Sequence, residues 1–305
     1  MDFDKDLQSI QEVRWLVAKA VVAQKELAKM SQQQVDGIAK AIADACAAQS
    51  ERLAKMAGQD KVLKNLLGSA ITWDSVKDMK TVGIIKDDRQ NGLMEVGVPM
   101  GVVAALIPST NPTSTTMYKS IISIKAGNAI VISPHPNAKN CIIETAKVIC
   151  EAARKAGAPE GIVQCITLPT MEATDALLKN RNIGIILATG GEAMVRAAYS
   201  SGNPALGVGP GNGPAFIEKS ANIPVAVKRI MDSKTFDNGT ICASEQSIIT
   251  ERCIEQKVVD EVSRQGGYFM TPEESEKLSK FILRANGTMN PKIVGKSAQT
   301  LADMA

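Results

Sequence analysis

The residue best suited to covalent chemistry is Cys242, a thiol in the loop-like segment DNGTICASE, residues 237–245. The other five cysteines lie on the face of an expected helix, in an expected strand or near a helix start, which favours a packing role. A loop thiol beside backbone N–H groups can act as a nucleophile through its thiolate. The residue pattern alone is compatible with a nucleophile or with an ordinary loop cysteine.

Three further loops follow short apolar runs. Residues 107–113, IPSTNPT, hold one amide side chain, Asn111, between two prolines. Asn111 is either a turn former or an N–H donor that the prolines aim into a crevice. Residues 133–136, SPHP, hold the only histidine, His135, which is either structural or a ligand contact. Residues 189–192, TGGE, join a strand to a helix. Glycines there let the backbone approach a phosphate, although such pairs also form ordinary turns.

Several familiar binding motifs are absent from the sequence. Neither the GxGxxG fingerprint nor the Walker phosphate loop occurs, and the segment GVGPGNG, residues 207–213, has the wrong spacing. One histidine and six cysteines without a CxxC pair argue against a zinc site. We therefore expect no metal, and we expect any nucleotide to be bound by a variant arrangement of loops.

From Met94 onward, the pattern indicates alternating strands and helices. Strands are expected at residues 101–107, 129–132, 162–167 and 183–188, and helices at 113–125, 138–155, 171–179 and 192–200. Continuous apolar strands joined by helices predict a parallel sheet that is buried on both faces. Its ligand crevice would run along the edge where the strands end, which is where the loops of Asn111, His135 and Thr189 belong.

The two ends of the chain have other patterns. The first ninety residues are expected to be helical, with a capping box at Ser31 that opens the second helix. A second unit is expected from near Phe236, with a strand at 246–250, a helix at 254–264 and a capping box at Thr271. About seventy residues make a thin core, so we expect the sequence to be incomplete at its C-terminus.

The composition excludes several classes of function. The net charge is +3 and aromatic residues make up 3% of the chain, which argues against a nucleic-acid partner. Prolines and glycines interrupt the uncharged stretches 96–118 and 197–217, so we expect no membrane span. The acidic start lacks the order of a signal peptide, and the unpaired thiols suit a reducing compartment; we therefore expect a cytoplasmic protein.

Taken in this order, the four loops resemble the aldehyde dehydrogenase superfamily. The segments GVVAALIPSTNP (101–112), SPHP (133–136), TGGE (189–192) and FDNGTICASE (236–245) are together similar to its coenzyme-A-acylating branch. The resemblance covers essentially the whole chain. It implies an α/β fold, with N-terminal helices and a variant Rossmann domain for NAD(P) and coenzyme A in residues 1–235. Residues 236–305 would begin an α/β catalytic domain that carries the nucleophile.

The resemblance also implies roles for residues. Cys242 would attack an aldehyde, and the Asn111 side chain and the Cys242 N–H would hold the oxyanion. The cofactor would be NAD, with NADP left open because Ser133 and Pro136 depart from positions that many relatives fill with lysine and with an acidic residue. The expected contacts to the cofactor and to coenzyme A are Ser109, Thr110, Ser133, Pro134, His135, Thr189, Gly190, Gly191, Gly209, Pro210 and Gly211.

The identity of the acyl acceptor can be inferred from a carboxylate that this sequence lacks. Hydrolytic relatives carry a glutamate in the segment that matches residues 206–213, whereas residues 197–217 contain no Asp or Glu here. Without a general base, water is a poor nucleophile and a thiol such as coenzyme A is favoured. We therefore expect the acyl group to pass to coenzyme A. The resemblance implies reversible conversion of a small aldehyde, acetaldehyde by default, to its acyl-CoA, and a homo-oligomer in the full-length protein. The alternatives are a hydrolytic aldehyde dehydrogenase and a non-catalytic fragment that only binds nucleotide.

Overall fold

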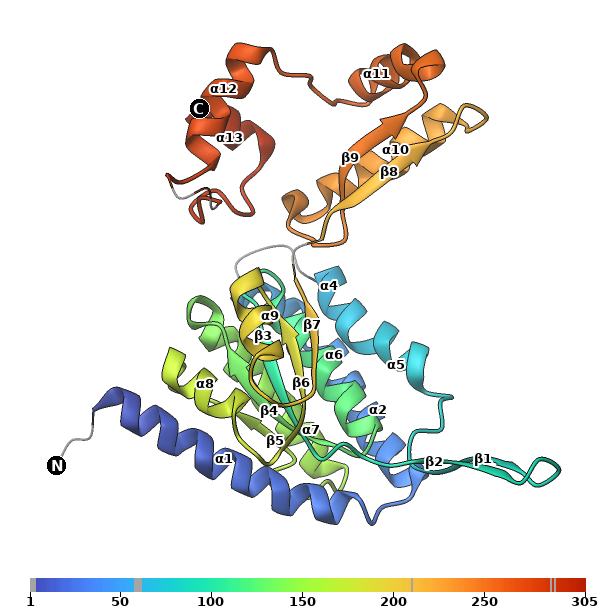
Figure 1. The fold of residues 1–305 in the computed structure, drawn as a ribbon, viewed down its shortest axis with the longest axis vertical. Coiled ribbons are helices and arrows are strands. Elements are labelled where there is room, and N and C mark those ends of the chain that lie inside the picture. Colours follow the sequence, from blue (N-terminus) through green and yellow to red (C-terminus); the bar gives the residue numbers. More distant parts are fainter. Residues whose placement is uncertain (1–3, 58–61, 210, 286, 288) are drawn as a thin grey trace. The chain divides into compact units, whose positions relative to one another are not determined.

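The computed structural model describes residues 4–57, 62–209, 211–285, 287 and 289–305, and it separates into two compact units, residues 1–209 and 210–305 (Figure 1). The functional boundary expected at residues 235/236 lies inside the second unit, directly after its first helix. The proposed division of roles between residues 1–235 and 236–305 stays a prediction.

A five-stranded parallel sheet forms the centre of the first unit. Its strands are β3 (Val102–Ile107), β4 (Ala129–Pro134), β5 (Val163–Cys165), β6 (Ile183–Thr189) and β7 (Ala205–Val208). They lie in the order β5-β4-β3-β6-β7, and every residue of β3 and β4 is buried. This is the mostly parallel, doubly wound arrangement, in which the first strand is central and the strand order reverses beside it. The expected parallel sheet is confirmed.

Helices cover both faces of this sheet. The crossover helices are α6 (Pro112–Lys125), α7 (Lys139–Lys155), α8 (Met171–Leu178) and α9 (Glu192–Tyr199), with a short helix η2 (Pro136–Ala138) before α7. They are preceded by α1 (Lys5–Leu27), α2 (Gln32–Ala48), α3 (Ser50–Met56), α4 (Val62–Leu66), the π-helical turn η1 (Leu67–Ile71) and α5 (Thr72–Val76). Helices α2, α6 and α7 pack together on one face, and α1 packs with α8 on the other (Figure 1). The capping box at Ser31 is present.

One segment of the N-terminal region is not helical as expected. Strands β1 (Gly83–Asp88) and β2 (Leu93–Gly97) form an antiparallel hairpin, so the expectation of helix throughout the first ninety residues is wrong here. The reason is local turn chemistry. Asn91 donates from its backbone and its side chain to the Asp88 carboxylate at 3.2 and 3.0 Å, and Gly92 takes a φ of +65°.

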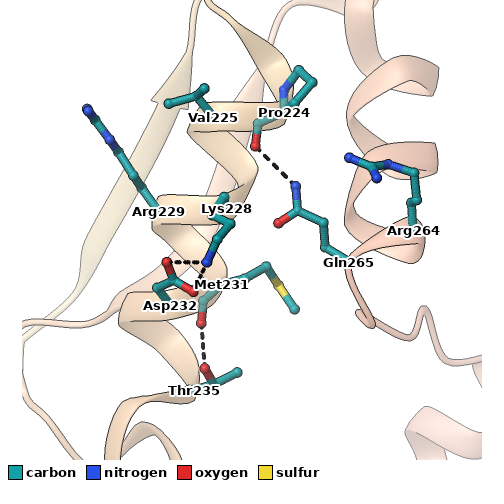
Figure 2. A pocket seen from close by; sticks show the side chains of 9 residues that line it. All are labelled: Pro224, Val225, Lys228, Arg229, Met231, Asp232, Thr235, Arg264 and Gln265. Carbon is teal, nitrogen blue, oxygen red and sulfur yellow. Dashed lines mark hydrogen bonds and ion pairs between the residues drawn. The ribbon is translucent and has the colours of Figure 1, made fainter.

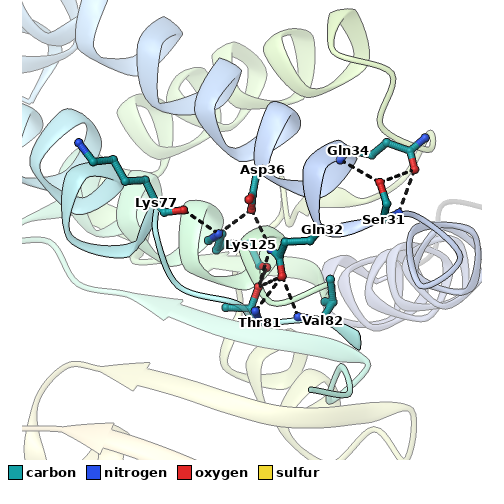
Figure 3. A network of polar contacts seen from close by, with 8 residues as sticks. All are labelled: Ser31, Gln32, Gln34, Asp36, Lys77, Thr81, Val82 and Lys125. Carbon is teal, nitrogen blue, oxygen red and sulfur yellow. Dashed lines mark hydrogen bonds and ion pairs between the residues drawn. The ribbon is translucent and has the colours of Figure 1, made fainter. Parts of the chain in front are cut away.

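A polar network ties the base of this hairpin to the helices (Figure 3). The Gln32 Oε1 accepts hydrogen bonds from the backbone N–H groups of Thr81 and Val82 at 2.8 and 3.0 Å. Beside it, the buried Lys125 ammonium lies 2.6 Å from the Asp36 carboxylate. The network therefore joins α2, the chain that enters the hairpin and the C-terminal end of α6.

The second unit contains a two-stranded parallel sheet and several helices. Strand β8 (Gly213–Ile217) pairs with β9 (Glu245–Thr250). The helices are α10 (Ile223–Thr235), η3 (Phe236–Gly239), η4 (Arg252–Ile254), α11 (Glu255–Arg264), α12 (Pro272–Ile282) and α13 (Ala298–Met304). Its small apolar core consists of Ile217, Val227, Ile254, Val258 and Val262. The capping box at Thr271 is present. Within the described residues of both units, no helix is long and apolar enough to cross a membrane.

Candidate functional site

Three of the four loops singled out in the sequence meet at one edge of the first unit's sheet. Strands β4, β3 and β6 are neighbours, and their carboxyl ends lead into the loops of His135, Asn111 and Gly191. The His135 N–H donates to the carbonyl of Ile107 at 3.1 Å, which joins two of the loops directly. The edge includes the point between β3 and β6 where the strand order reverses, which is the usual ligand crevice of such sheets.

Asn111 is the residue from which α6 starts. It occupies the N-cap position, directly before Pro112, but its side chain caps no backbone N–H. The Oδ1 of Asn111 is buried and has no hydrogen-bond partner among the described residues. A buried amide oxygen without a protein partner is unusual, and it is consistent with a side chain held for a ligand. The adjacent Ser109 is exposed and Thr110 is half-buried.

The loop after β4 is partly engaged in packing. Ser133 and Pro134 are the last residues of the strand and both are buried. The Ser133 hydroxyl shares a hydrogen bond of 3.3 Å with the Thr174 hydroxyl of α8. His135 is half-buried; its Nδ1 accepts a hydrogen bond from the Asn137 N–H at 3.2 Å, and burial lowers its pKa. At this loop, therefore, the Ser133 hydroxyl already contacts protein.

The turn after β6 offers a backbone surface for an anion. Gly191 is the N-cap of α9 and, as a glycine, has no side chain that could cap the first N–H groups of this helix. A methyl group built on Gly191 would meet no atom within 4 Å, so the space beside the turn is open. A helix N-terminus with open N–H groups suits a phosphate, and the residues present therefore fit the pyrophosphate of a dinucleotide. The Gly190 N–H donates to the Val208 carbonyl at 3.2 Å, which brings the end of β7 alongside.

Cys242 lies in the second unit, and its side chain is exposed. The chain that leads to it is tightly bent, because Asp237, Asn238 and Gly239 take φ angles of +49°, +51° and +71°. Positive φ is costly for residues with a Cβ, so this backbone is held by its surroundings. The Asn238 Nδ2 donates to the Gly295 carbonyl at 2.8 Å, and this bond anchors the bend.

Two further residues, Ser244 and Gly211, constrain the Cys242 loop. Ser244 is fully buried, and both its N–H and its hydroxyl donate to the Ile241 carbonyl, at 3.2 and 3.0 Å. Gly211 passes so close that a Cβ at this position would overlap the carbonyl oxygen of Cys242. The half-exposed Gly209 lies at the end of the first unit, and Pro210 lies outside the described residues. Asn111 and Cys242 belong to different units, so their pairing across a cleft stays a prediction.

Sequence reasoning missed one buried charge-bearing residue at the sheet edge, Lys119 of α6. Its side chain is only 2% exposed, and its Nζ donates to the carbonyls of Leu106 and Leu187 at 2.9 and 2.7 Å. Burial lowers the pKa of Lys119 to about 7. The available signal was a lysine within a helix whose neighbouring residues Met117 and Ile121 are core-forming.

A hollow of about 690 Å³ lies in the second unit, lined by α10 and the end of α11 (Figure 2). Its charges are largely neutralised within the protein: Lys228 pairs with Asp232 at 2.7 Å, and Arg264 pairs with Glu261 at 2.6 Å. None of its lining residues was predicted from the sequence to bind a ligand. Within the described part of the chain, no cluster of three or more His, Cys, Asp or Glu side chains could hold a metal ion.

Comparison with known proteins gives the family. The sequence model described as "Aldehyde dehydrogenase family" matches residues 7–266. The chain belongs to the aldehyde dehydrogenase family. The α/β fold implied by the four loops is confirmed by solved aldehyde dehydrogenases. A probable aldehyde dehydrogenase from Listeria monocytogenes EGD-e is 61% identical, with a TM-score of 0.96 over 99% of this chain and 68% of that chain.

The chain is also similar to aldehyde dehydrogenases of other kinds. The aldehyde-alcohol dehydrogenase of Clostridium acetobutylicum is 47% identical over 291 residues, which are 93% of this chain and 33% of that protein. A propionaldehyde dehydrogenase from Rhodopseudomonas palustris, solved with bound coenzyme A and an acylated cysteine, is 30% identical. Its TM-score is 0.83, and the match covers 96% of this chain and 68% of that chain. The chain spans about a third of the length of the first curated relatives that it matches.

Proposed function

We propose that this aldehyde dehydrogenase chain oxidises a small aldehyde and passes the acyl group to coenzyme A. The observation that carries the proposal is the absence of a carboxylate side chain around the end of β7. Val208 lies beside the Thr189 turn, since its carbonyl accepts from the Gly190 N–H, and residues 197–217 contain no Asp or Glu. The segment in which hydrolytic relatives keep their general base therefore has no group that could activate water.

The covalent step takes place at Cys242. The Cys242 sulfur forms a bond to the aldehyde carbon, and the electron pair of the C=O double bond moves onto the oxygen. The Asn111 amide and the Cys242 N–H would donate to this oxyanion. A bound nicotinamide supplies the acceptor for the hydride that then leaves the carbon. Loss of the hydride with its electron pair restores the C=O bond and leaves a thioester on Cys242.

The thioester is resolved by a second thiol. The coenzyme A thiolate attacks the acyl carbon, and the bond to the Cys242 sulfur breaks, which returns Cys242 as a thiolate. A thiol is partly ionised near neutral pH and strongly nucleophilic, so it needs less help from a base than water does. The acylated cysteine and bound coenzyme A in the Rhodopseudomonas palustris relative support this assignment.

The cofactor is proposed to lie over the Thr189–Gly191 turn, with its pyrophosphate at the N-terminus of α9. The open space beside Gly191 and the uncapped helix start support this placement. Either NAD or NADP fits this proposal, because the turn would contact the pyrophosphate group, which both cofactors contain. We further propose a cytoplasmic homo-oligomer, and the six unpaired cysteines support a reducing compartment.

The test is product analysis with acetaldehyde, NAD and coenzyme A. We expect NADH and acetyl-CoA from the wild-type chain and neither from Cys242→Ala. Cys253→Ala is the matched control, since Cys253 is also exposed and lies in the same unit. Acetate as the main product in the presence of coenzyme A would identify a hydrolytic enzyme. Nucleotide binding without turnover would identify a non-catalytic chain. Either result overturns the proposal.

A further inference from the structure

Lys119 connects two strands of the first unit that share no loop. The Leu106 carbonyl belongs to β3 and the Leu187 carbonyl to β6, and the Lys119 Nζ donates to both. In the register of these strands Leu106 lies opposite Ala188, so the two carbonyls are neighbours across the strand pair. One amine thus bridges β3 and β6 next to their carboxyl ends.

This bridge lies where the strand order reverses. From β3 the chain runs through α6 to β4 on one side, while β6 occupies the other side of β3. The loops that leave β3 and β6 hold Asn111 and Gly191. Tyr118, the residue before the lysine, adds a second tie, because its hydroxyl lies 3.5 Å from the Thr189 hydroxyl at the end of β6. Helix α6 therefore begins at the Asn111 loop, and its residues Tyr118 and Lys119 contact the end of β6, which leads into the Gly191 turn.

Lys119 differs from the other buried lysine of the same helix. The Lys125 ammonium has the Asp36 carboxylate at 2.6 Å and the Trp73 ring centroid at 5.9 Å, which account for a buried charge. No carboxylate pairs with Lys119 among the described residues; the only acceptors of its Nζ there are the two carbonyls. An amine that loses its charge on burial keeps two N–H groups, and these match the two acceptors.

We propose that Lys119 is a positioning residue that ties the carboxyl ends of β3 and β6 together and thereby fixes the Asn111 loop relative to the Thr189–Gly191 turn. The role of these loops in binding nucleotide rests on the proposed function. The tie itself rests on the two hydrogen bonds. Loss of the amine removes a donor from each of two buried carbonyls, and the paired strand ends should open more often.

Hydrogen exchange of the whole chain tests the tie without reference to function. In Lys119→Met, we expect the amides of residues 107–111 and 189–191 to exchange about tenfold faster or more, together, because a lost buried hydrogen bond lowers local opening free energies by this order. Lys125→Met, on the same helix and equally buried, should leave both segments unchanged relative to the rest of the sheet. Unchanged exchange in Lys119→Met, or equal acceleration in both variants, overturns the proposal.

Two further measurements separate positioning from simple packing. Lys119→Gln keeps two N–H donors without a charge and should recover part of the slow exchange and of the NADH affinity, whereas Lys119→Met should weaken NADH binding about tenfold. If the amides of the two segments exchange as fast in Lys119→Gln as in Lys119→Met, packing and not hydrogen bonding holds the strand ends, and the proposal is wrong. If Lys119→Met does not fold, Lys119→Gln, with two N–H groups, replaces it and should show intermediate exchange; exchange as slow as in the wild type overturns the proposal.

If the wild-type chain itself binds no NADH, the proposed function loses its nucleotide site. The exchange experiment still decides whether Lys119 ties the strands, so the two failures are distinguishable.

Discussion

The backbone around Cys242 and Asn111 determines whether these two side chains are free to take part in a reaction. Cys242 comes shortly after three residues with positive φ, and the chain bends there, so the thiol lies outside regular secondary structure. Asn111 stands at a helix start whose N-cap position it fills without using its side chain. In both cases the side chain is left available because the main chain has been fixed by other contacts.

The first prediction concerns the amide donor. Asn111→Ala should lower kcat on the order of a hundredfold or more, because an oxyanion loses one of its donors in the transition state, while NADH affinity is retained. Steady-state NADH formation and a nucleotide titration measure the two effects. Asn128→Ala is a useful control, since the Asn128 side chain bonds backbone at the opposite end of the strands. A kcat within about threefold of wild type would remove Asn111 from the oxyanion site.

The second prediction concerns the backbone contact beneath Cys242. In Gly211→Ala, the new methyl group would overlap the Cys242 carbonyl, so the thiol loop must shift. We expect acyl transfer to fall on the order of tenfold or more, the scale on which a displaced nucleophile loses rate. Gly213→Ala is the matched control, because a Cβ there lies 3.7 Å from the Ser244 carbonyl, an ordinary contact. Equal activities of the two variants would show that the overlap is relieved without moving Cys242.

At the level of secondary structure, polar side chains on helices contact the backbone of the strands and of the segment that enters the hairpin. Lys119 contacts β3 and β6, and Gln32 holds the entry to the β1–β2 hairpin (Figure 3). Lys119 adds a donor to two strand carbonyls, and Gln32 accepts from two backbone N–H groups. Their removal should therefore act locally and measurably.

The elements differ in how well the sequence predicts them. Strands β3 and β4 are predictable because both faces are buried and their residues form unbroken apolar runs. The exposed edge of β7 and the hairpin lack this pattern, although Asn91-Gly92 is a turn signal that sequence reasoning could have used. The role of Lys119 is not predictable from its neighbours, because its two acceptors lie 13 and 68 residues away along the chain.

The third prediction concerns the Gln32 network. Gln32→Leu removes the acceptor of two backbone N–H groups, those of Thr81 and Val82, and should destabilise the first unit by about 2 kcal/mol. Gln33→Leu, an exposed neighbour on the same helix, should change stability by less than about 0.5 kcal/mol. Thermal or denaturant unfolding measures both variants. Similar losses in the two would mean that leucine disturbs α2 itself and that the network adds nothing.

The fourth prediction is a pH dependence of stability from Lys119. The pKa of lysine is 10.5 in the unfolded chain and about 7 for Lys119 in the folded one, because burial disfavours the charge. Between these values the unfolded state holds the extra proton, so this group makes the fold more stable as pH rises, by about 1.4 kcal/mol per pH unit. Below pH 7 the full penalty is present. The difference in unfolding free energy between wild type and Lys119→Met, measured across this range, should carry this slope; a flat difference contradicts it.

At the scale of the whole molecule, the two units differ in how much apolar surface they bury. In the first, β3 and β4 are buried along their whole length between two helical layers. In the second, the strands carry exposed apolar side chains, including Phe216 at 63% and Ile249 at 48% exposure, over a core of five buried residues. Since apolar burial is the main source of stability, the second unit is expected to be the weaker one.

Unfolding should therefore begin in residues 211–305. Both tryptophans, Trp15 and Trp73, lie in the first unit, so fluorescence reports that unit, while circular dichroism averages over both. We expect the dichroism to fall at lower denaturant concentration than the fluorescence changes, and the amides of β8 and β9 to exchange at least about tenfold faster than those of β3 and β4, a difference of about 1.4 kcal/mol in opening free energy. Coincident transitions with equal protection would mean that the two units unfold as one cooperative body, because the stability of each would then depend on the other. In that case the exposed apolar side chains of the second unit would not weaken it, and its stability could not be judged from its own core.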